Sequence, residues 1–208
     1  MLSSKQVVAA GVKSVRQRGL EALGIRPLSE RLGVTPMALY RHVETAQALT
    51  DAVVDEVLSL VPAVAAETGF ASAARAWARG ARSVLTNFRG VARHVLTHWF
   101  ELPRVLDWIE GLLAAAERDG IRGRDGVGAV NSIFTYVLMR AELEEAVRQA
   151  KVVHRKLPRG RKHAARWSRI RANASEYEVA HFDVYFEFGL DALLAGISGI
   201  HGERRPRP

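Results

Sequence analysis

The sequence predicts an all-α protein with a small N-terminal three-helix helix-turn-helix domain and a larger helical domain. Nearly every stretch with apolar periodicity has helical spacing, and no segment shows the sustained alternation that is typical of strands. Breaks at glycine and proline divide the chain into lengths that suit helices. Apolar residues make up 48% of the 208 residues, which is enough to bury a sizeable core.

The first predicted helix begins behind a capping box formed by Ser3 and Gln6, and Gly19 stops it. Its apolar residues at i, i+4 and i+7 are Val8, Val12 and Val15.

A pair of short helices follows, joined by a turn at Gly33. The first of the pair runs from Pro27 to Leu32. The second has Thr35 as its N-cap and Pro36 in its first position.

The remaining helices are longer. A fourth ends at Pro62 and carries the apolar series Leu49, Val53, Val57 and Leu60. The later ones are expected at about 70–88, 90–100, 103–119, 124–150, 163–174 and 178–197. The expected organisation is a small N-terminal domain over 1–45, a connecting helix over 46–62, a larger helical domain over 63–200, and a basic tail over 201–208.

Charge and composition narrow the class of partner. The net charge of +8 and pI near 10.4 favour an anionic partner such as nucleic acid or a membrane surface. Residues 1–43 alone carry +5. The chain has no cysteine, which excludes disulfides and thiolate metal sites. The N-terminus resembles no signal peptide, and no apolar run reaches the roughly 18–20 residues of a membrane span. We therefore expect a cytoplasmic protein that does not use a membrane.

The segment "PLSERLGVTPMALYRHV" has the form of a helix-turn-helix, which places its second helix in the DNA major groove. Helical spacing turns five residues inward: Leu28, Leu32, Val34, Leu39 and Val43. It leaves six available outside: Thr35, Met37, Ala38, Tyr40, Arg41 and His42. Small apolar side chains can contact the thymine methyl, and hydroxyls at a helix N-terminus suit phosphate. The alternative is a plain helical hairpin within a core.

Residues 4–60 resemble the N-terminal domain of the TetR (tetracycline repressor) family. The run from Leu23 to Val43 and "ALTDAVVDEVL" carry the resemblance. It implies a dimeric transcriptional repressor that binds a palindromic operator and is released by a small hydrophobic or aromatic effector. By position in the family, Arg26 reads a guanine. Pro36, Met37 and Ala38 face bases, and Tyr40 and His42 contact backbone and groove.

Two positions depart from the family pattern. Gly24 replaces a capping Thr or Ser that touches phosphate, and Ala46 replaces a Lys that grips phosphate. The helix from about Ala46 to Leu60 is expected to be the lever between the domains, as the one element that links them.

The second domain is expected to hold the effector between helices. The pocket candidates, for which packing in a core is the alternative, are His94, His98, Trp99, Phe100, Trp108, Phe134 and Tyr136. The spacing of His94 and His98 lets two imidazoles share a metal, but no further ligand set accompanies them. We therefore expect no metal and no cofactor.

Two apolar stripes suggest a dimer interface. The first comprises Phe182, Tyr185, Phe186, Gly189, Leu190, Leu193, Leu194 and Ile197. The second comprises Val130, Phe134, Val137, Leu138 and Ala141, for which burial within one subunit is nearly as good an interpretation.

Other interpretations stay open at this point. A small helical enzyme would need a nucleophile beside a base or a phosphate loop, and neither pattern is present. A constitutive DNA-binding protein would need no aromatic-rich second domain. The basic run 151–171 is interpreted as a solvated connection, with DNA or an anionic effector as the alternative.

Overall fold

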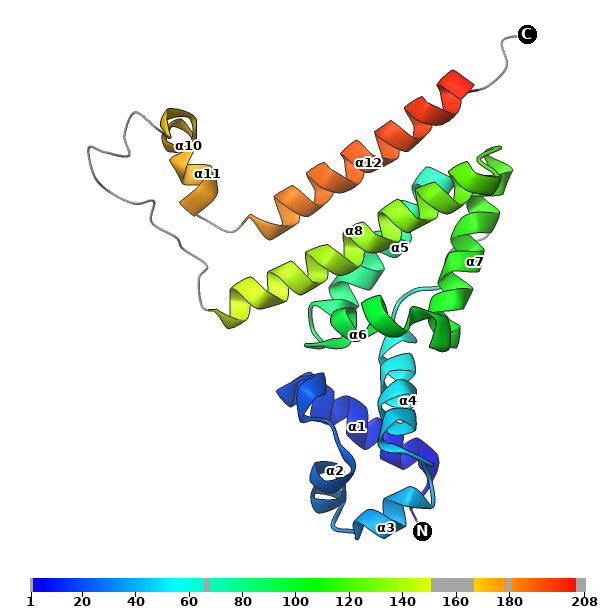
Figure 1. Cartoon of the computed structure of the whole chain (residues 1–208), viewed down its shortest axis with the longest axis vertical. Coiled ribbons are helices and arrows are strands. Elements are labelled where there is room, and N and C mark those ends of the chain that lie inside the picture. The colour runs from blue at the N-terminus through cyan, green and yellow to red at the C-terminus, as the bar shows by residue number, and fades with distance from the viewer. Residues whose placement is uncertain (1, 66–67, 151–166, 179–180, 205–208) are drawn as a thin grey trace.

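The computed structural model describes residues 2–65, 68–150, 167–178 and 181–204 (Figure 1). Throughout these ranges the regular structure is helical, as the sequence predicted, and contains no strand. None of the helices in this part of the chain has both the length and the apolar character needed to cross a bilayer.

A head of three helices forms the N-terminal end: α1 (Ser4–Arg18), α2 (Ile25–Leu32) and α3 (Pro36–Tyr40), with a 3-10 turn at Leu20–Ala22. The capping box of Ser3 and Gln6 is present, and Gly19 ends α1. The buried face of α1 is rotated by about one residue relative to the predicted face. Its buried residues are Val7, Ala10, Gly11, Ser14 and Val15, and Val8 and Val12 are partly buried.

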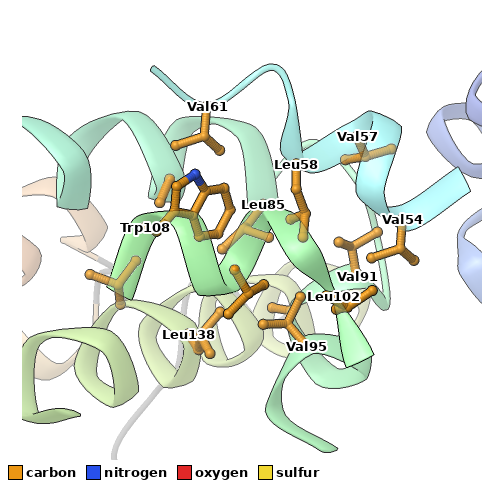
Figure 2. Packing of buried hydrophobic residues seen from close by; sticks show 14 of the residues in the cluster. Val54, Val57, Leu58, Val61, Leu85, Val91, Val95, Leu102, Trp108 and Leu138 are labelled. Carbon is orange, nitrogen blue, oxygen red and sulfur yellow. The ribbon is translucent and has the colours of Figure 1, made fainter. Parts of the chain in front are cut away.

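Helix α4 (Ala46–Leu58) packs against both the head and the larger domain. On the head side, Gly11 of α1 is so near that an added Cβ would lie 2.4 Å from Cγ2 of Val53. On the other side, Val54 and Leu58 lie among the side chains of the core helices (Figure 2). One helix therefore packs against both the head and the larger domain, so a change in its tilt alters the packing of both.

The larger domain is built around α8 (Gly123–Gln149), which contacts α5, α6, α7 and α12. These neighbours are α5 (Phe70–Leu85), α6 (Val91–His98), α7 (Pro103–Arg118) and α12 (Phe182–Arg204). Helices α8 and α12 run side by side (Figure 1). A 3-10 turn, η2 (Trp99–Glu101), joins α6 to α7.

Between α8 and α12 the structure has two short helices, α10 (Ser168–Ala172) and α11 (Ala174–Glu178). Of the helix predicted over 163–174, the structure has α10, and residues 163–166 lie outside the described residues. The last predicted helix begins later, at Phe182, and continues to Arg204. Most of the basic run 151–171 and the end of the basic tail also lie outside the described residues.

The expectation that α4 alone links head and core is wrong. The backbone N–H of Leu20 donates to the carbonyl of Arg89 in the α5–α6 turn over 2.8 Å. The Arg89 guanidinium lies 3.5 Å from the Glu21 carboxylate. The next residue, Gly90, donates its N–H to Glu145 of α8 over 3.0 Å. These three contacts join residues that are far apart in the sequence, so helical periodicity could not predict them.

Candidate DNA-binding and effector sites

Helix α3 exposes Thr35, Met37 and Tyr40 as the sequence predicted, whereas Ala38 is half-buried. Thr35 is the N-cap and its hydroxyl accepts from the N–H of Ala38 over 3.3 Å, while Pro36 occupies the first turn. Leu39 is fully buried, whereas Met37 is 69% exposed and Tyr40 is exposed. An exposed apolar side chain beside exposed hydroxyl groups on a capped helix suits contact with a DNA groove.

The turn before α3 is set by local chemistry. Gly33 ends α2 in the left-handed conformation with φ of 66°, which favours glycine. The N–H groups of Gly33 and Val34 bond to the carbonyls of Glu30 and Ser29. Of the five residues predicted to face inward, three are buried: Leu28, Leu39 and Val43. The other two, Leu32 and Val34, are partly buried against the core.

The other DNA-contact candidates lie on the surface of the head. The Arg26 side chain on α2 is 88% exposed, and its 3.9 Å approach to Glu30 is too loose to hold it. Arg41 is exposed and His42 is half-buried. The full candidate set remains Arg26, Thr35, Pro36, Met37, Ala38, Tyr40, Arg41 and His42.

Both departures from the family pattern have a visible structural setting. Gly24 is the N-cap of α2 and supplies no side-chain hydrogen bond to the helix start. Helix α4 begins at Ala46, which is exposed, behind the N-cap Thr45. The hydroxyl of Thr45 accepts from Ala48 N–H over 2.9 Å, so the α4 N-terminus is capped without a charged residue.

An apolar cavity of about 210 Å³ lies between α6, α7 and α8, with its mouth beside α8. Its lining residues are Leu96, Trp99, Ile109, Leu113, Val127, Val130, Asn131, Phe134 and Thr135. Trp99 and Phe134 are the two pocket candidates from the sequence that line it.

Three aromatic candidates lie elsewhere. Phe100 is 71% exposed and stacks on Trp99 outside the lining. Trp108 is buried edge-on against Trp77, with ring centroids 5.7 Å apart. The Tyr136 hydroxyl donates to the carbonyl of Phe186 over 2.9 Å, which ties α8 to α12. Trp108 and Tyr136 therefore pack and hold the core and do not line this cavity.

The two histidines also lie outside this cavity. Nε2 of His94 on α6 is 3.1 Å from Oδ1 of Asp51 on α4, and the His98 ring stacks on it at 4.2 Å. Burial lowers the pKa of His94, which favours a neutral ring that donates to Asp51. No set of three or more His, Asp or Glu side chains in the described ranges could hold a metal. His94 therefore bridges the connecting helix and the core, and His98 stacks against it.

Seven lining residues were not among the candidates. The aliphatic ones, Leu96, Ile109, Leu113, Val127 and Val130, cannot be told from ordinary core positions in a sequence. Asn131 and Thr135 left a detectable signal, since two polar residues four apart interrupt one face of an otherwise apolar helix.

Helix α12 buries only part of the stripe that the sequence suggested, since Tyr185 is exposed and Phe182, Gly189 and Leu193 are half-buried. Phe186, Leu190 and Leu194 are buried within the subunit against the core, so they cannot contact a second copy. The most exposed apolar residues near the start of α12 lie on the side opposite Phe186, with Phe188 75% exposed and Val184 64% exposed. In the second stripe Val130, Phe134, Val137, Leu138 and Ala141 are all buried, whereas Met139 and Leu143 of α8 are exposed. The prediction for α12 was incomplete because this helix is apolar on most sides, so periodicity alone does not select which face is buried.

The architecture defines a helix-turn-helix head on a helical ligand-binding domain, and comparison with known proteins names the family. Residues 63–200 match the family model "Tetracyclin repressor-like, C-terminal domain". The chain belongs to the tetracycline repressor (TetR) family.

Two relatives are repressors. The chain is 28% identical over 141 residues to the class D tetracycline repressor protein of Escherichia coli, an alignment that spans 66% of this chain and 64% of that protein. It is 26% identical over 217 aligned positions to the HTH-type transcriptional repressor DrrR1 of Streptomyces coeruleorubidus, spanning 98% of this chain and 80% of DrrR1.

Two solved structures share the fold along nearly the whole chain. Apo ActR from Streptomyces coelicolor has a TM-score of 0.80 at 23% identity and covers 97% of both chains. BioQ from Mycobacterium smegmatis has a TM-score of 0.74 at 25% identity, covering 96% of this chain and 99% of BioQ. ActR has also been solved with actinorhodin, and BioQ with its double-stranded DNA operator.

Proposed function

We propose that this protein is a dimeric, effector-responsive transcriptional repressor whose head binds a palindromic operator. The observation that carries the proposal is the outward face of α3, where Met37 and Tyr40 are exposed on a capped helix that rests on buried Leu39. A major groove accepts such a helix, and the net +5 charge of residues 1–43 suits phosphate.

Within this proposal the base-reading role falls on few residues. Hydrogen-bond donors to base edges come from Arg26 and Arg41, and Met37 and Ala38 supply apolar contacts. Thr35 and Tyr40 suit phosphate oxygens, as does the N-terminus of α3. One short helix reads too few base pairs alone, so two copies on a palindrome are needed.

The division into residues 1–45, 46–62, 63–200 and 201–208 is part of the proposal. It is supported by the packing of α4, whose Val53 contacts the head and whose Leu58 contacts the core. Ligand and DNA are then coupled when the effector prefers one placement of the heads over another. The ActR and BioQ complexes support this assignment by their shared fold.

The experiment is fluorescence anisotropy with duplexes from the DNA upstream of the protein's own gene, over a salt series. Arg26→Ala is expected to weaken specific binding by about 1–3 kcal/mol per half-site and to relax one base position. Arg122→Ala is the matched control, because Arg122 is an exposed arginine at the start of α8, far from α2 (Figure 1). Equal effects of the two variants, or binding that does not depend on salt, would overturn the proposal.

A further inference from the structure

The cavity between α6, α7 and α8 restricts the effector more narrowly than the fold does. We infer that its ligand is an uncharged, flat aromatic molecule of about two fused rings, with hydroxyl or carbonyl groups along one edge that Asn131 and Thr135 bind. This inference rests on the proposed function in one respect, namely that the bound ligand acts as an effector of DNA binding. The binding site itself is argued from the cavity.

The residues that line the cavity favour an uncharged ligand. None of the residues that surround the cavity ionises at any ordinary pH, and most are aliphatic or aromatic. A carboxylate or ammonium seated among the aliphatic and aromatic residues would lose its hydration and find no counter-ion. An ionised ligand is therefore expected to bind much more weakly than its neutral analogue.

Flatness and aromatic character follow from two rings in the wall. Trp99 of η2 and Phe134 of α8 both line the cavity, and each contacts a second aromatic ring outside it. Phe100 stacks on Trp99 with centroids 3.5 Å apart, and Trp77 stacks on Phe134 at 5.9 Å. Phe134 and its partner Trp77 are both buried, so the Phe134 ring loses little freedom on binding. Together with Trp99 it suits stacking or edge contact with a planar ligand.

Size follows from the volume. The cavity measures about 210 Å³, which exceeds the roughly 150 Å³ of an engineered cavity that binds benzene. It is smaller than the roughly 300–1,000 Å³ of pockets for drug-sized ligands. Two fused rings fit between these limits.

The polar edge is the distinctive feature. Asn131 and Thr135 lie one helical turn apart on α8, and both are exposed at the mouth of the cavity. Neither side chain hydrogen-bonds to another residue in the described part of the chain. By contrast, the Ser132 hydroxyl beside them donates to the Gly128 carbonyl over 2.8 Å. The amide and the free hydroxyl can thus bind ligand oxygens spaced along one edge.

The test is calorimetric titration of the protein, without DNA, using three probes: 2,7-dihydroxynaphthalene, whose two hydroxyls lie along one edge, naphthalene and 2-naphthoate. The diol is expected to bind about threefold to tenfold more tightly than naphthalene for each hydrogen bond it gains. The naphthoate is expected to bind at least about thirtyfold more weakly than the diol.

Variants separate the hydrogen bonds from the packing. Thr135→Val and Asn131→Leu are expected to weaken diol binding by about threefold to tenfold each and to leave naphthalene binding within about twofold. Ser132→Ala is the matched control and should bind all probes as the wild type does. Val130→Phe, which fills the cavity, should abolish binding of both neutral probes, and circular dichroism would check that each variant is folded.

Three results would overturn the inference. They are naphthoate binding as tight as the diol, equal losses for diol and naphthalene in Thr135→Val, and no binding of either neutral compound. Operator binding is measured separately, so the two proposals can fail independently. A diol that binds in this way and leaves operator affinity unchanged supports the site and contradicts the effector response.

Discussion

Arg82 of α5 and Glu144 of α8 form a bidentate ion pair inside the larger domain. Nε and Nη2 of Arg82 donate to the two carboxylate oxygens over 2.8 and 3.1 Å, and the Glu144 side chain is fully buried. Nη2 also reaches Asp183 of α12 over 2.7 Å. One guanidinium thus joins three helices that come from distant parts of the sequence.

Removing the buried partner of this pair should cost more than removing an exposed one. Glu144→Ala leaves Arg82 largely desolvated with one partner, so we expect a loss of about 3 kcal/mol in the free energy of unfolding. Glu187→Ala is the control, because Glu187 forms a bidentate pair with Arg79 that is partly open to solvent. Its expected loss is below about 1 kcal/mol. Urea denaturation at one protein concentration measures both, and similar losses would contradict the argument.

The contact between His94 and Asp51 predicts a pH dependence of stability. Burial lowers the pKa of His94 in the folded state below the value of about 6.5 that it has when unfolded. The unfolded chain therefore binds this proton more readily, and stability is lost as the pH falls through about 6.5 toward the lower folded pKa.

His94→Gln keeps a hydrogen-bond donor for Asp51 and removes the titration. We expect its free energy of unfolding to fall less than that of the wild type between about pH 7.5 and about pH 5.5. His42→Gln, in the head and away from the α4–α6 contact, should follow the wild-type curve. An unchanged pH dependence in His94→Gln would show that this imidazole is not responsible.

The family's lysine can be restored at the start of α4. Ala46→Lys adds one phosphate contact per subunit, at a cost of a few tenths of a kcal/mol against the helix dipole. Operator and non-operator duplexes should both bind more tightly. The slope of log K against log salt should steepen by about 1.8 per dimer, with no change in base preference.

Ala71→Lys adds the same charge at an exposed position in the first turn of α5 and should leave the slope unchanged. If Ala46→Lys also leaves it unchanged, α4 begins too far from the DNA backbone, and this chain docks differently from its family.

The exposed side of α12 should form the contact between two copies. Phe188→Glu is expected to convert the dimer to monomer at micromolar concentration, because it places a charge in an apolar interface. Phe100→Glu alters an equally exposed phenylalanine on η2 and should remain dimeric. Sedimentation velocity distinguishes the two, and a dimeric Phe188→Glu variant would place the interface elsewhere.

The head could be read from the sequence because local signals specify it. Gly33 adopts a positive φ, Thr35 caps α3 and Pro36 fills its first turn, and each depends on residues a few positions away. The apolar spacing then decided that Leu39 faces inward and Met37 outward. Backbone geometry within one turn therefore determined the candidate DNA-binding surface.

The face of α12 and the lining of the cavity depended on packing between distant helices. Several sides of α12 are apolar, and the choice among them is made where Gly189 meets Tyr136 of α8. A Cβ at Gly189 would lie 2.2 Å from the Tyr136 hydroxyl oxygen, so α12 approaches α8 along this glycine and turns Phe188 outward. Likewise, Asn131 and Thr135 become part of the cavity lining only because α6 and α7 pack beside them. Helical periodicity carries no record of which neighbour covers a face, because that depends on shape complementarity between segments far apart in the chain.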